Sequence, residues 1–206
     1  VRAALLDRAG DYPHSHNILR REKGEYSLSF PAGDSLFWWK LAYPMGFRKE
    51  IMAASREFDL APWYILAIIR EESGFRAQIE SYAHAYGLMQ LLRKTGKWAA
   101  ESMGMTYSNE ILQDPQTNIR LGTWYLSHLM KRLGHPALAV ASYNCGRSRV
   151  VRMMNNIDSS DLDEFIENIP IDQTRRYTKR VMSSAAIYRY LYFGGWDGSF
   201  MDLSIR

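Results

Sequence analysis

The sequence predicts an all-α fold, and three observations support that prediction. Apolar residues repeat at intervals of three and four in several segments, proline stands in the first turn of these segments, and glycine or proline follows them. Convincing period-two alternation, which indicates half-buried strands, is absent from the sequence. With 206 residues, 47% of them apolar and 23% charged, the chain is sufficient for one compact domain with a full core.

The clearest predicted helix begins at Pro62, because proline suits the first turn of a helix. Ile65, Ile68 and Ile69 then fall on one face of that helix. Glu72 takes the next position of the same stripe, seven residues after Ile65. The pattern therefore places a carboxylate on the apolar face of a core helix.

Two further helices have clear start and stop signals. Asp114 and Pro115 provide a cap and a first-turn proline, and the helix that they begin ends at Gly134. Pro136 begins the next helix, which Gly146 ends.

Two more helices are predicted toward the end of the chain. Ser160 and Asp163 have the spacing of a capping box ahead of an apolar pair, and Pro170 stops that helix. The last helix is expected over residues 172–193, because Gly194 follows it.

The composition divides the chain into three parts. Glycine and proline interrupt residues 1–40, which we expect to be an arm or linker from a preceding domain. Residues 41–195 contain the predicted helices and form the main domain, and residues 196–206 form a C-terminal tail. The chain begins at Val1 without a charged-then-apolar leader, so we expect a processed product or a part of a longer protein.

Several kinds of site are excluded by composition. Cys145 is the only cysteine, so neither an internal disulfide nor a cysteine metal site can form. The five histidines are scattered, and we predict no metal site and no cofactor. The longest apolar run, residues 61–69, is far shorter than the ~20 residues that cross a bilayer, so no transmembrane segment is predicted.

The net charge of +4 favours an acidic partner, either nucleic acid or an anionic cell-wall polymer. Basic residues gather within 147–152 and 175–180. No recognition-helix signature accompanies them, and a solvated helix face explains the second cluster equally well. We therefore predict no nucleic-acid partner.

Glu72 is the residue best suited to acid–base chemistry. Partial burial disfavours a charged carboxylate, raises its pKa and allows it to act as a general acid near neutral pH. Glu71 lies about 100° around the helix, nearer the polar side, so we assign it to solvent and expect Glu71→Gln to be mild. Two ordinary helix-end charges are the alternative explanation.

Two polar segments have the composition of a sugar site. Residues 81–90, Ser-Tyr-Ala-His-Ala-Tyr-Gly-Leu-Met-Gln, offer hydroxyls, aromatic faces and an amide. Residues 143–146, Tyr-Asn-Cys-Gly, end a helix of small residues that permits close backbone approach. A surface loop and ordinary helix punctuation explain the same two segments without a ligand.

A set of motifs occurs in a defined order along the chain. They are Glu72-Ser73, Ser81, Gly87-Leu88-Met89-Gln90, Asn118-Ile119 with Gly122 and Tyr125-Leu126, Tyr143-Asn144-Cys145-Gly146, and Ile169-Pro170 followed by Thr174-Arg175 and Tyr177. In order and spacing they resemble the catalytic domain of the soluble lytic transglycosylases, enzymes that cleave the glycan of peptidoglycan and are related to goose-type lysozyme. The resemblance extends from about Tyr43 to about Tyr192.

The resemblance implies a lysozyme-like transglycosylase domain over residues 41–195. It implies that Glu72 protonates the oxygen between N-acetylmuramic acid and N-acetylglucosamine, then takes the proton of the muramic C6 hydroxyl, so that a 1,6-anhydro end forms without water. Substrate-binding roles are implied for Ser81, Met89, Gln90, Tyr143, Asn144, Gln173 and Tyr177.

Four residues depart from the family pattern. His84 replaces a glycine, Tyr86 a small residue, Arg93 a proline and Gln173 a glutamate. These departures lie around the expected cleft and bear on substrate preference and rate. Two alternatives stay open: a hydrolytic muramidase of the same fold, with Glu80 as the nearby second carboxylate, and a catalytically inactive wall-binding module.

The resemblance also implies partners and a location. Peptidoglycan glycan strands are the expected partner, with other cell-wall proteins as further candidates. The expected location is the periplasm or the cell envelope, which the protein reaches by export.

Overall fold

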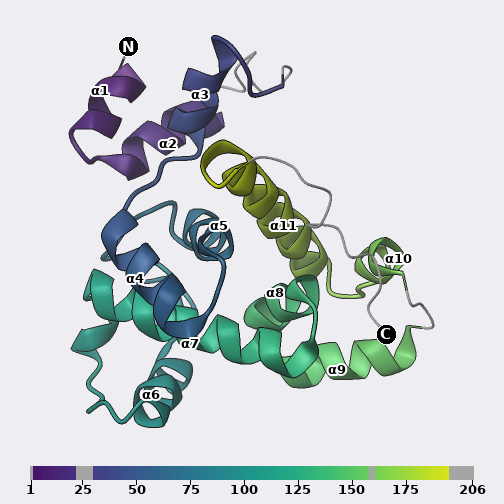
Figure 1. Ribbon diagram of the computed structural model, residues 1–206. Coiled ribbons are helices and arrows are strands. Elements are labelled where there is room, and N and C mark those ends of the chain that lie inside the picture. The colour runs from purple at the N-terminus through teal and green to yellow at the C-terminus, as the bar shows by residue number, and fades with distance from the viewer. Residues whose placement is uncertain (1, 22–29, 158–160, 195–206) are drawn as a thin grey trace.

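The computed structural model describes residues 2–21, 30–157 and 161–194. In these parts the chain is helical apart from one small hairpin and its connections (Figure 1). The elements are α1 (Arg2–Arg8), α2 (Tyr12–Arg21), α3 (Ser35–Ala42), α4 (Arg48–Phe58), α5 (Pro62–Glu72), β1 (Ala85–Tyr86), β2 (Leu91–Leu92), α6 (Arg93–Ser102), a short 3-10 turn η2 (Glu110–Leu112), α7 (Pro115–Leu133), α8 (Pro136–Cys145), α9 (Arg147–Asn156), α10 (Leu162–Glu167) and α11 (Asp172–Tyr192). The predicted all-α class is confirmed.

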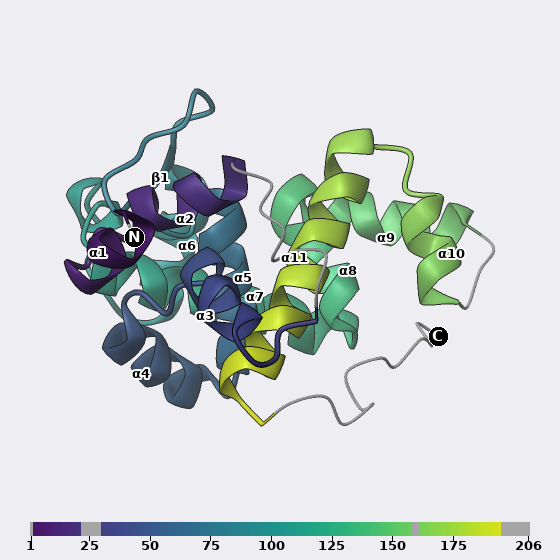
Figure 2. The same cartoon turned by 90° about the horizontal axis from the view of Figure 1, so that it is seen from above.

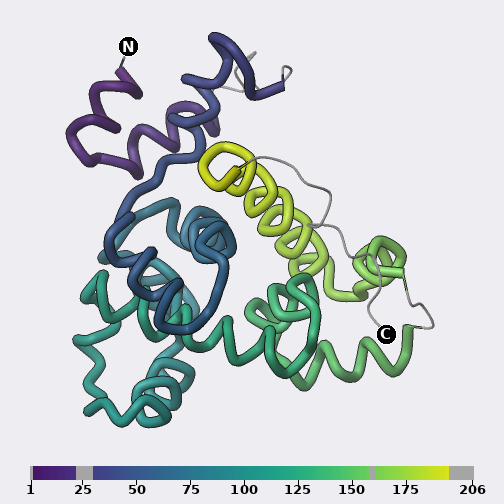
Figure 3. Tube along the Cα trace, in the orientation of Figure 1, coloured from purple at the N-terminus to yellow at the C-terminus, as the bar shows by residue number. Residues whose placement is uncertain are grey.

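Helix α5 forms the centre of the core. Its residues from Tyr64 to Arg70 are all buried, so the helix is covered on every side. Helix α11 packs along α5 and also on α8, and α8 packs on α7. Figures 1 and 3 show α5 nearly end-on with α11 beside it. The last residue of α5, Glu72, is therefore held by a rigid and fully packed helix.

The start and stop signals of α7 and α8 act as predicted. The Asp114 carboxylate accepts a hydrogen bond of 2.8 Å from the backbone nitrogen of Thr117, and Gly134 ends α7 in the left-handed conformation, with φ of 72°. Helix α8 begins at Pro136, and Gly146 follows its last residue.

Helix α10 begins one residue later than the capping-box prediction requires. Its cap is Asp161, whose carboxylate accepts hydrogen bonds from the backbone nitrogens of Asp163 and Glu164. Aspartate caps a helix as well as serine does. The predicted cap, Ser160, lies outside the described residues, and the assignment of the cap to it is wrong.

The N-terminal region differs from the arm or linker expected for residues 1–40. It forms α1, α2 and α3, and these helices join the main core. His16 is buried, with Nδ1 2.9 Å from the carbonyl oxygen of Ala42, and the ring of Tyr12 lies 6.3 Å from that of Phe75. The arm is therefore not confirmed for the described part of this region, because α2 packs directly against the loop that follows α5.

The hairpin β1–β2 is fixed to α7 by the buried amide of Asn118. Its oxygen accepts from the backbone nitrogen of Met89 at 2.8 Å, and its nitrogen donates to the carbonyls of Tyr86 and Leu112 at 2.9 and 2.8 Å. A Cβ at Gly87 would lie 2.4 Å from the Asn118 amide, and the φ of Gly87 is 75°. Only glycine fits this close approach.

The hairpin and helices α9 and α10 lie on opposite sides of the molecule, with α8 and α11 between them (Figure 2). Most candidate site residues come from α5, the hairpin, α8 and α11, and hydrogen bonds from Tyr177 to Glu72 and from Tyr143 to Met89 link these elements. In the described parts of the chain, every helix is too short or too polar to cross a membrane.

Candidate active site

The Glu72 carboxyl lies at the end of α5 in a nearly dry environment. The hydroxyl of Tyr177 donates a hydrogen bond of 2.6 Å to its Oε1. Burial raises the pKa of Glu72 to about 7, and the charge of Glu71 adds to this, while the Tyr177 hydrogen bond and Arg180 act in the opposite direction. Near neutral pH this carboxyl can therefore give a proton and take one back.

The neighbouring Glu71 does not face solvent, which corrects the assignment made from helical phase. Its side chain is only 1% exposed and accepts hydrogen bonds from Arg20, Arg70, Arg180 and Ser184. Burial by itself would raise its pKa, but the charges of Arg70 and Arg20 and the bonds from Ser184 and Arg180 lower it. Glu71 lies about 100° around α5 from Glu72. That side of α5 does not face solvent, because α2 and α11 cover it.

Two tyrosines lie near the Glu72 carboxyl, Tyr177 buried and Tyr143 half-buried. Tyr177 is on α11 and bonds to it directly, whereas Tyr143 is on α8 and donates to the carbonyl of Met89 at 2.8 Å. Burial and the negative charge of Glu72 raise the pKa of both tyrosines well above the usual range. Both hydroxyls therefore stay protonated.

Asn144 is linked to the same part of α11. Its Oδ1 accepts a hydrogen bond of 2.8 Å from the hydroxyl of Thr174, which lies one turn before Tyr177. This bond orients the amide and leaves its nitrogen to donate elsewhere. Gln173 is exposed in the first turn of α11. The structure thus joins Asn144 and Tyr177 to one group of side chains and places Gln173 at its edge.

Ser81 lies in the tight turn that precedes β1. Its Oγ accepts from the backbone nitrogen of Ala85 at 3.0 Å, and its backbone carbonyl accepts from His84 at 2.9 Å. The hydroxyl hydrogen stays available to a ligand. In the described residues Ser81 makes no hydrogen bond to Glu72, so its predicted role depends on a substrate between them.

Met89 and Gln90 hold the hairpin. Met89 is fully buried, and a Cβ added to Gly122 would lie 2.5 Å from its sulfur, which corrects the expectation that Met89 lines the cleft wall. The Gln90 amide nitrogen donates to the carbonyls of Ile79 and Gly87 at 3.3 and 2.9 Å. Its oxygen accepts from none of the described residues and remains free for a ligand.

Three of the four departures from the family pattern form one hydrogen-bond network with Glu80. The carboxylate of Glu80 bonds to Nδ1 of His84 at 2.6 Å and to the hydroxyl of Tyr86 at 2.9 Å, and Arg93 donates to that hydroxyl at 2.5 Å. The bonds from His84 and Tyr86 lower the pKa of Glu80. This network ties the loop before β1 to the start of α6.

Sequence reasoning missed the residues that support the site. Arg70 is buried beside Glu71, with its guanidinium 4.0 Å from the ring centre of Tyr43 and its Nε 3.4 Å from the carbonyl of Ala42. One signal was present: a charged pair that directly continues a wholly apolar helix predicts a buried ion pair. Thr174 stood in a family motif but was given no role, although it lies three residues before Tyr177 on the same helix face.

Cys145 and the histidines show no catalytic arrangement in the described residues. Cys145 is a half-buried free thiol, and burial raises its pKa. Of the residues that the structure describes, no three His, Cys, Asp or Glu side chains are grouped so as to hold a metal ion.

Comparison with known proteins gives consistent relatives. The family model for the transglycosylase SLT domain matches residues 49–166. The soluble lytic murein transglycosylase of Escherichia coli K12 is 32% identical over 152 residues, which cover 72% of this chain and 24% of that protein. The membrane-bound lytic murein transglycosylase C of Cronobacter sakazakii is 32% identical over 162 residues, 68% of this chain and 45% of that protein.

A solved structure agrees with these relatives. An inactive mutant of the lytic transglycosylase Slt from Pseudomonas aeruginosa superposes with a TM-score of 0.78 at 30% identity, covering 91% of this chain and 29% of that one. The chain spans about a quarter to a third of the length of the first curated relatives. The predicted lysozyme-like transglycosylase fold is confirmed, and, with the family model over more than half of its residues, the chain belongs to the transglycosylase SLT domain family.

Proposed function

We propose that this chain is a peptidoglycan lytic transglycosylase. It cleaves the β-1,4 bond between N-acetylmuramic acid and N-acetylglucosamine and leaves a 1,6-anhydromuramic end, with no water consumed. The proposal depends most on one observation: the Glu72 carboxyl is largely shielded from solvent, which raises its pKa to about 7, and within the described residues it accepts one hydrogen bond, from Tyr177.

One carboxyl performs both proton transfers. Protonated Glu72 gives its proton to the glycosidic oxygen, and the bond from that oxygen to the muramic C1 breaks. The acetamido oxygen of the same sugar stabilises the positive charge that develops at C1. The C6 hydroxyl oxygen then bonds to C1, and its proton passes to the Glu72 carboxylate. The enzyme returns to its starting state, because Glu72 is protonated again.

The side chains around Glu72 suit the acetamido group and the neighbouring sugar atoms. Tyr177 holds the carboxyl in place, and the Asn144 amide nitrogen and the Ser81 hydroxyl are donors with no other protein acceptor among the described residues. We assign these two donors and Tyr143 to orienting the acetamido group. Gln90 offers its free amide oxygen to a sugar hydroxyl or amide.

The end groups of the product test this proposal. Purified sacculi are digested with the parent protein and with Glu72→Gln, and the released fragments are analysed by mass spectrometry. The parent is expected to give 1,6-anhydro ends, and Glu72→Gln to give none. Reducing ends instead would support the hydrolytic muramidase, and no fragments from either protein would support the inactive wall-binding module.

The hydrolytic alternative needs Glu80 to activate water. The structure gives Glu80 two hydrogen-bond partners, His84 and Tyr86, that compete for its carboxylate. In Glu80→Gln the anhydro ends should persist if the transglycosylase mechanism operates. Loss of all products in that variant, with reducing ends in the parent, would favour hydrolysis.

We place the reaction in the periplasm or cell envelope, where peptidoglycan is the substrate. Residues 41–195 form the catalytic unit in this proposal and residues 1–40 join it to a preceding domain, whereas the tail expected over residues 196–206 lies outside the described residues. The matched region of the family model, residues 49–166, lies inside the proposed unit. The helices formed by the N-terminal part suggest a packed connection in place of a flexible one.

A further inference from the structure

We propose that the outer face of α7 carries a second glycan-binding site, in which Trp98, Trp124 and Lys131 hold one sugar of an anionic peptidoglycan strand while that strand is cut at Glu72. This inference rests on the proposed function. It concerns a pocket and an aromatic cluster that the mechanism leaves unused.

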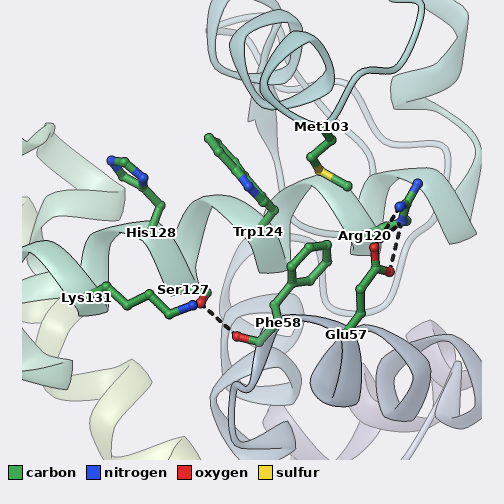
Figure 4. Close-up of a pocket in the computed structure, with 8 residues that line it drawn as sticks. All are labelled: Glu57, Phe58, Met103, Arg120, Trp124, Ser127, His128 and Lys131. Carbon is green, nitrogen blue, oxygen red and sulfur yellow. Dashed lines mark hydrogen bonds and ion pairs between the residues drawn. The ribbon is translucent and has the colours of Figure 1, made fainter.

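A pocket of about 400 Å³ opens on this face between three helices (Figure 4). It is lined by the end of α4, the residue that follows α6 and one stripe of α7, namely Glu57, Phe58, Met103, Arg120, Trp124, Ser127, His128 and Lys131. The α7 residues recur at intervals of three and four, so they share a face of that helix. A pocket of this volume falls within the range of small-ligand sites, roughly 300–1,000 Å³.

Three aromatic rings, those of Trp98, Trp124 and His128, border the pocket and are called the aromatic ledge below. The Trp98 ring meets those of Trp124 and His128 edge to face, with centroids 4.8 and 4.9 Å apart, and Trp124 stacks on His128 at 5.4 Å. Trp98 is nevertheless 41% exposed. A partly exposed indole offers an apolar face to the C–H side of a pyranose ring and an N–H to its hydroxyls.

The charges near the ledge favour an anionic ligand. Arg120 donates to both carboxylate oxygens of Glu57, at 2.6–3.0 Å, so these two charges neutralise each other. Lys131, Arg132 and Arg147 are exposed and form no salt bridge with any residue that the structure describes. The surplus is therefore positive, which suits the lactyl or stem-peptide carboxylates of muramic acid.

Arg132 and Arg147 lie close to the aromatic ledge. Burial and the positive charges of Arg132 and Arg147 together lower the pKa of His128. At neutral pH His128 is therefore an uncharged aromatic surface, and the cations that an acidic sugar needs stand beside it. Aromatic face and positive charge occur within one patch.

A row of aromatic rings joins this patch to the catalytic side chains. The Trp98 ring lies 6.0 Å from that of Tyr125, which in turn lies 5.3 Å from Tyr143. Tyr143 is close enough to Glu72 for that carboxylate to raise its pKa. Ring contacts therefore link the patch to Tyr143, and the proposal places one strand over both the patch and Glu72.

Binding to an uncleaving protein tests the inference. Glu72→Gln serves as the background, and its affinity for long, uncrosslinked peptidoglycan strands is measured by calorimetry. Adding Trp98→Ala is expected to raise Kd about tenfold, which corresponds to about 1.4 kcal/mol. Trp98→Phe, which keeps an aromatic face, should recover most of the affinity. Trp38→Ala on α3 is the matched control, because Trp38 is a tryptophan of nearly equal exposure, 40%.

Charge reversal provides a second variant that does not disturb the core. Lys131→Glu should weaken binding several-fold at low salt, and the difference should shrink as salt is added. Lys49→Glu, an exposed lysine on α4, is the control. Equal affinity of Trp98→Ala and Trp38→Ala, or of the two lysine variants, overturns the proposed site. So does equally strong binding of duplex DNA in competition with the strands.

Cleavage by the parent separates this inference from the proposed function. If the parent forms anhydro ends while Trp98 and Lys131 have no effect on strand binding, the second site is wrong and the catalytic proposal stands. If strand binding depends on both residues but no substrate is cleaved, the catalytic proposal is wrong and the glycan site stands.

Discussion

Two adjacent carboxylates at the end of α5 lie in opposite surroundings. On one side, Glu71 is enclosed by three arginines and Ser184, and its pKa is lowered. On the other side, the hydroxyl of Tyr177 is the one group that hydrogen-bonds to Glu72 among the described residues, and burial raises the Glu72 pKa to about 7. Burial acts to raise the pKa of both carboxyls, so burial alone does not decide the charge.

The difference teaches how the fold separates stability from chemistry. On the Glu71 side the carboxylate is paired with arginines, so the loss of one partner leaves a buried charge uncompensated and costs stability. In the part of the chain that the structure describes, no cation forms a salt bridge with Glu72, so a charged carboxylate there costs stability and its proton is available. The predictions below test that division.

The largest effect is expected for Glu72→Gln. Activity should fall at least about a thousandfold, since the only proton donor in the mechanism is removed. The protein should also become more stable at pH 8. The rise of the Glu72 pKa from 4.5 to about 7 means that the charged carboxylate lowers the free energy of unfolding of the parent by about 3 kcal/mol at that pH.

The sign follows from a raised pKa in the folded state. The stabilising contribution of neutral Glu72 is complete below pH 4.5 and is lost as pH rises through 7. Relative to the parent, the variant should therefore gain stability as pH rises from 4.5 to about 7, and it should keep that gain at higher pH. Denaturant unfolding of parent and variant at pH 4 and pH 8 measures it. A gain that is the same at both pH values contradicts the assignment.

Glu71→Gln should reduce stability by about 3 kcal/mol at pH 7, because Arg70 loses its buried counter-charge. This replaces the mild effect expected from helical phase. The pKa of Glu71 is lowered, so the stability that it contributes is present above pH 4.5 and is lost at lower pH. Urea unfolding at pH 7 and pH 3 checks this, and Glu101→Gln, in an exposed ion pair, is the small-effect control. A loss below 1 kcal/mol at pH 7 would show that the network is not important.

Tyr177→Phe should shift the pH profile of kcat/KM. The Tyr177 hydrogen bond lowers the pKa of Glu72, so its removal should raise that pKa by about one unit. The descending limb of the profile should move to higher pH by the same amount. Tyr188→Phe is the matched control, because Tyr188 is a buried tyrosine of α11 that bonds to the carbonyl of Pro44. Equal profiles for both variants would exclude the proposed contact.

Gln173→Glu should have the smallest effect. The new carboxylate stands one turn before Tyr177, and a negative charge there should raise the pKa of Glu72 by a few tenths of a unit. The descending limb should move up slightly, and more at low salt. Gln113→Glu, another exposed glutamine, is the control. An unchanged profile would make position 173 peripheral.

The sequence predicted what depends on local rules. The helix ends at Asp114, Gly134 and Pro136 follow from capping and from proline and glycine conformations, and the apolar stripe that leads to Glu72 follows from helical periodicity. Tyr177 and Asn144 were reached through family motifs. These features need no knowledge of which elements touch.

The remaining features depend on long-range packing. Helical phase placed Glu71 in solvent because it cannot show that α2 and α11 cover that side of α5. The helices α1 and α2 were not expected, since glycine and proline suggested a linker and the partner surface at Phe75 lies far along the chain. Likewise, Arg93 donates a hydrogen bond to the hydroxyl of Tyr86. Both residues depart from the family pattern, and the sequence does not show that they are in contact.

The most direct test is a titration of the Glu72 carboxyl itself. Protein with ¹³C-labelled glutamate side chains is followed by NMR from pH 4 to pH 9, and the Glu72 signal is assigned by its absence in Glu72→Gln. A pKa near 7, with the Glu71 signal still that of a carboxylate below pH 4.5, is the predicted result. A Glu72 pKa near 4.5 would contradict the account, because the carboxyl would then hold no proton to give at neutral pH.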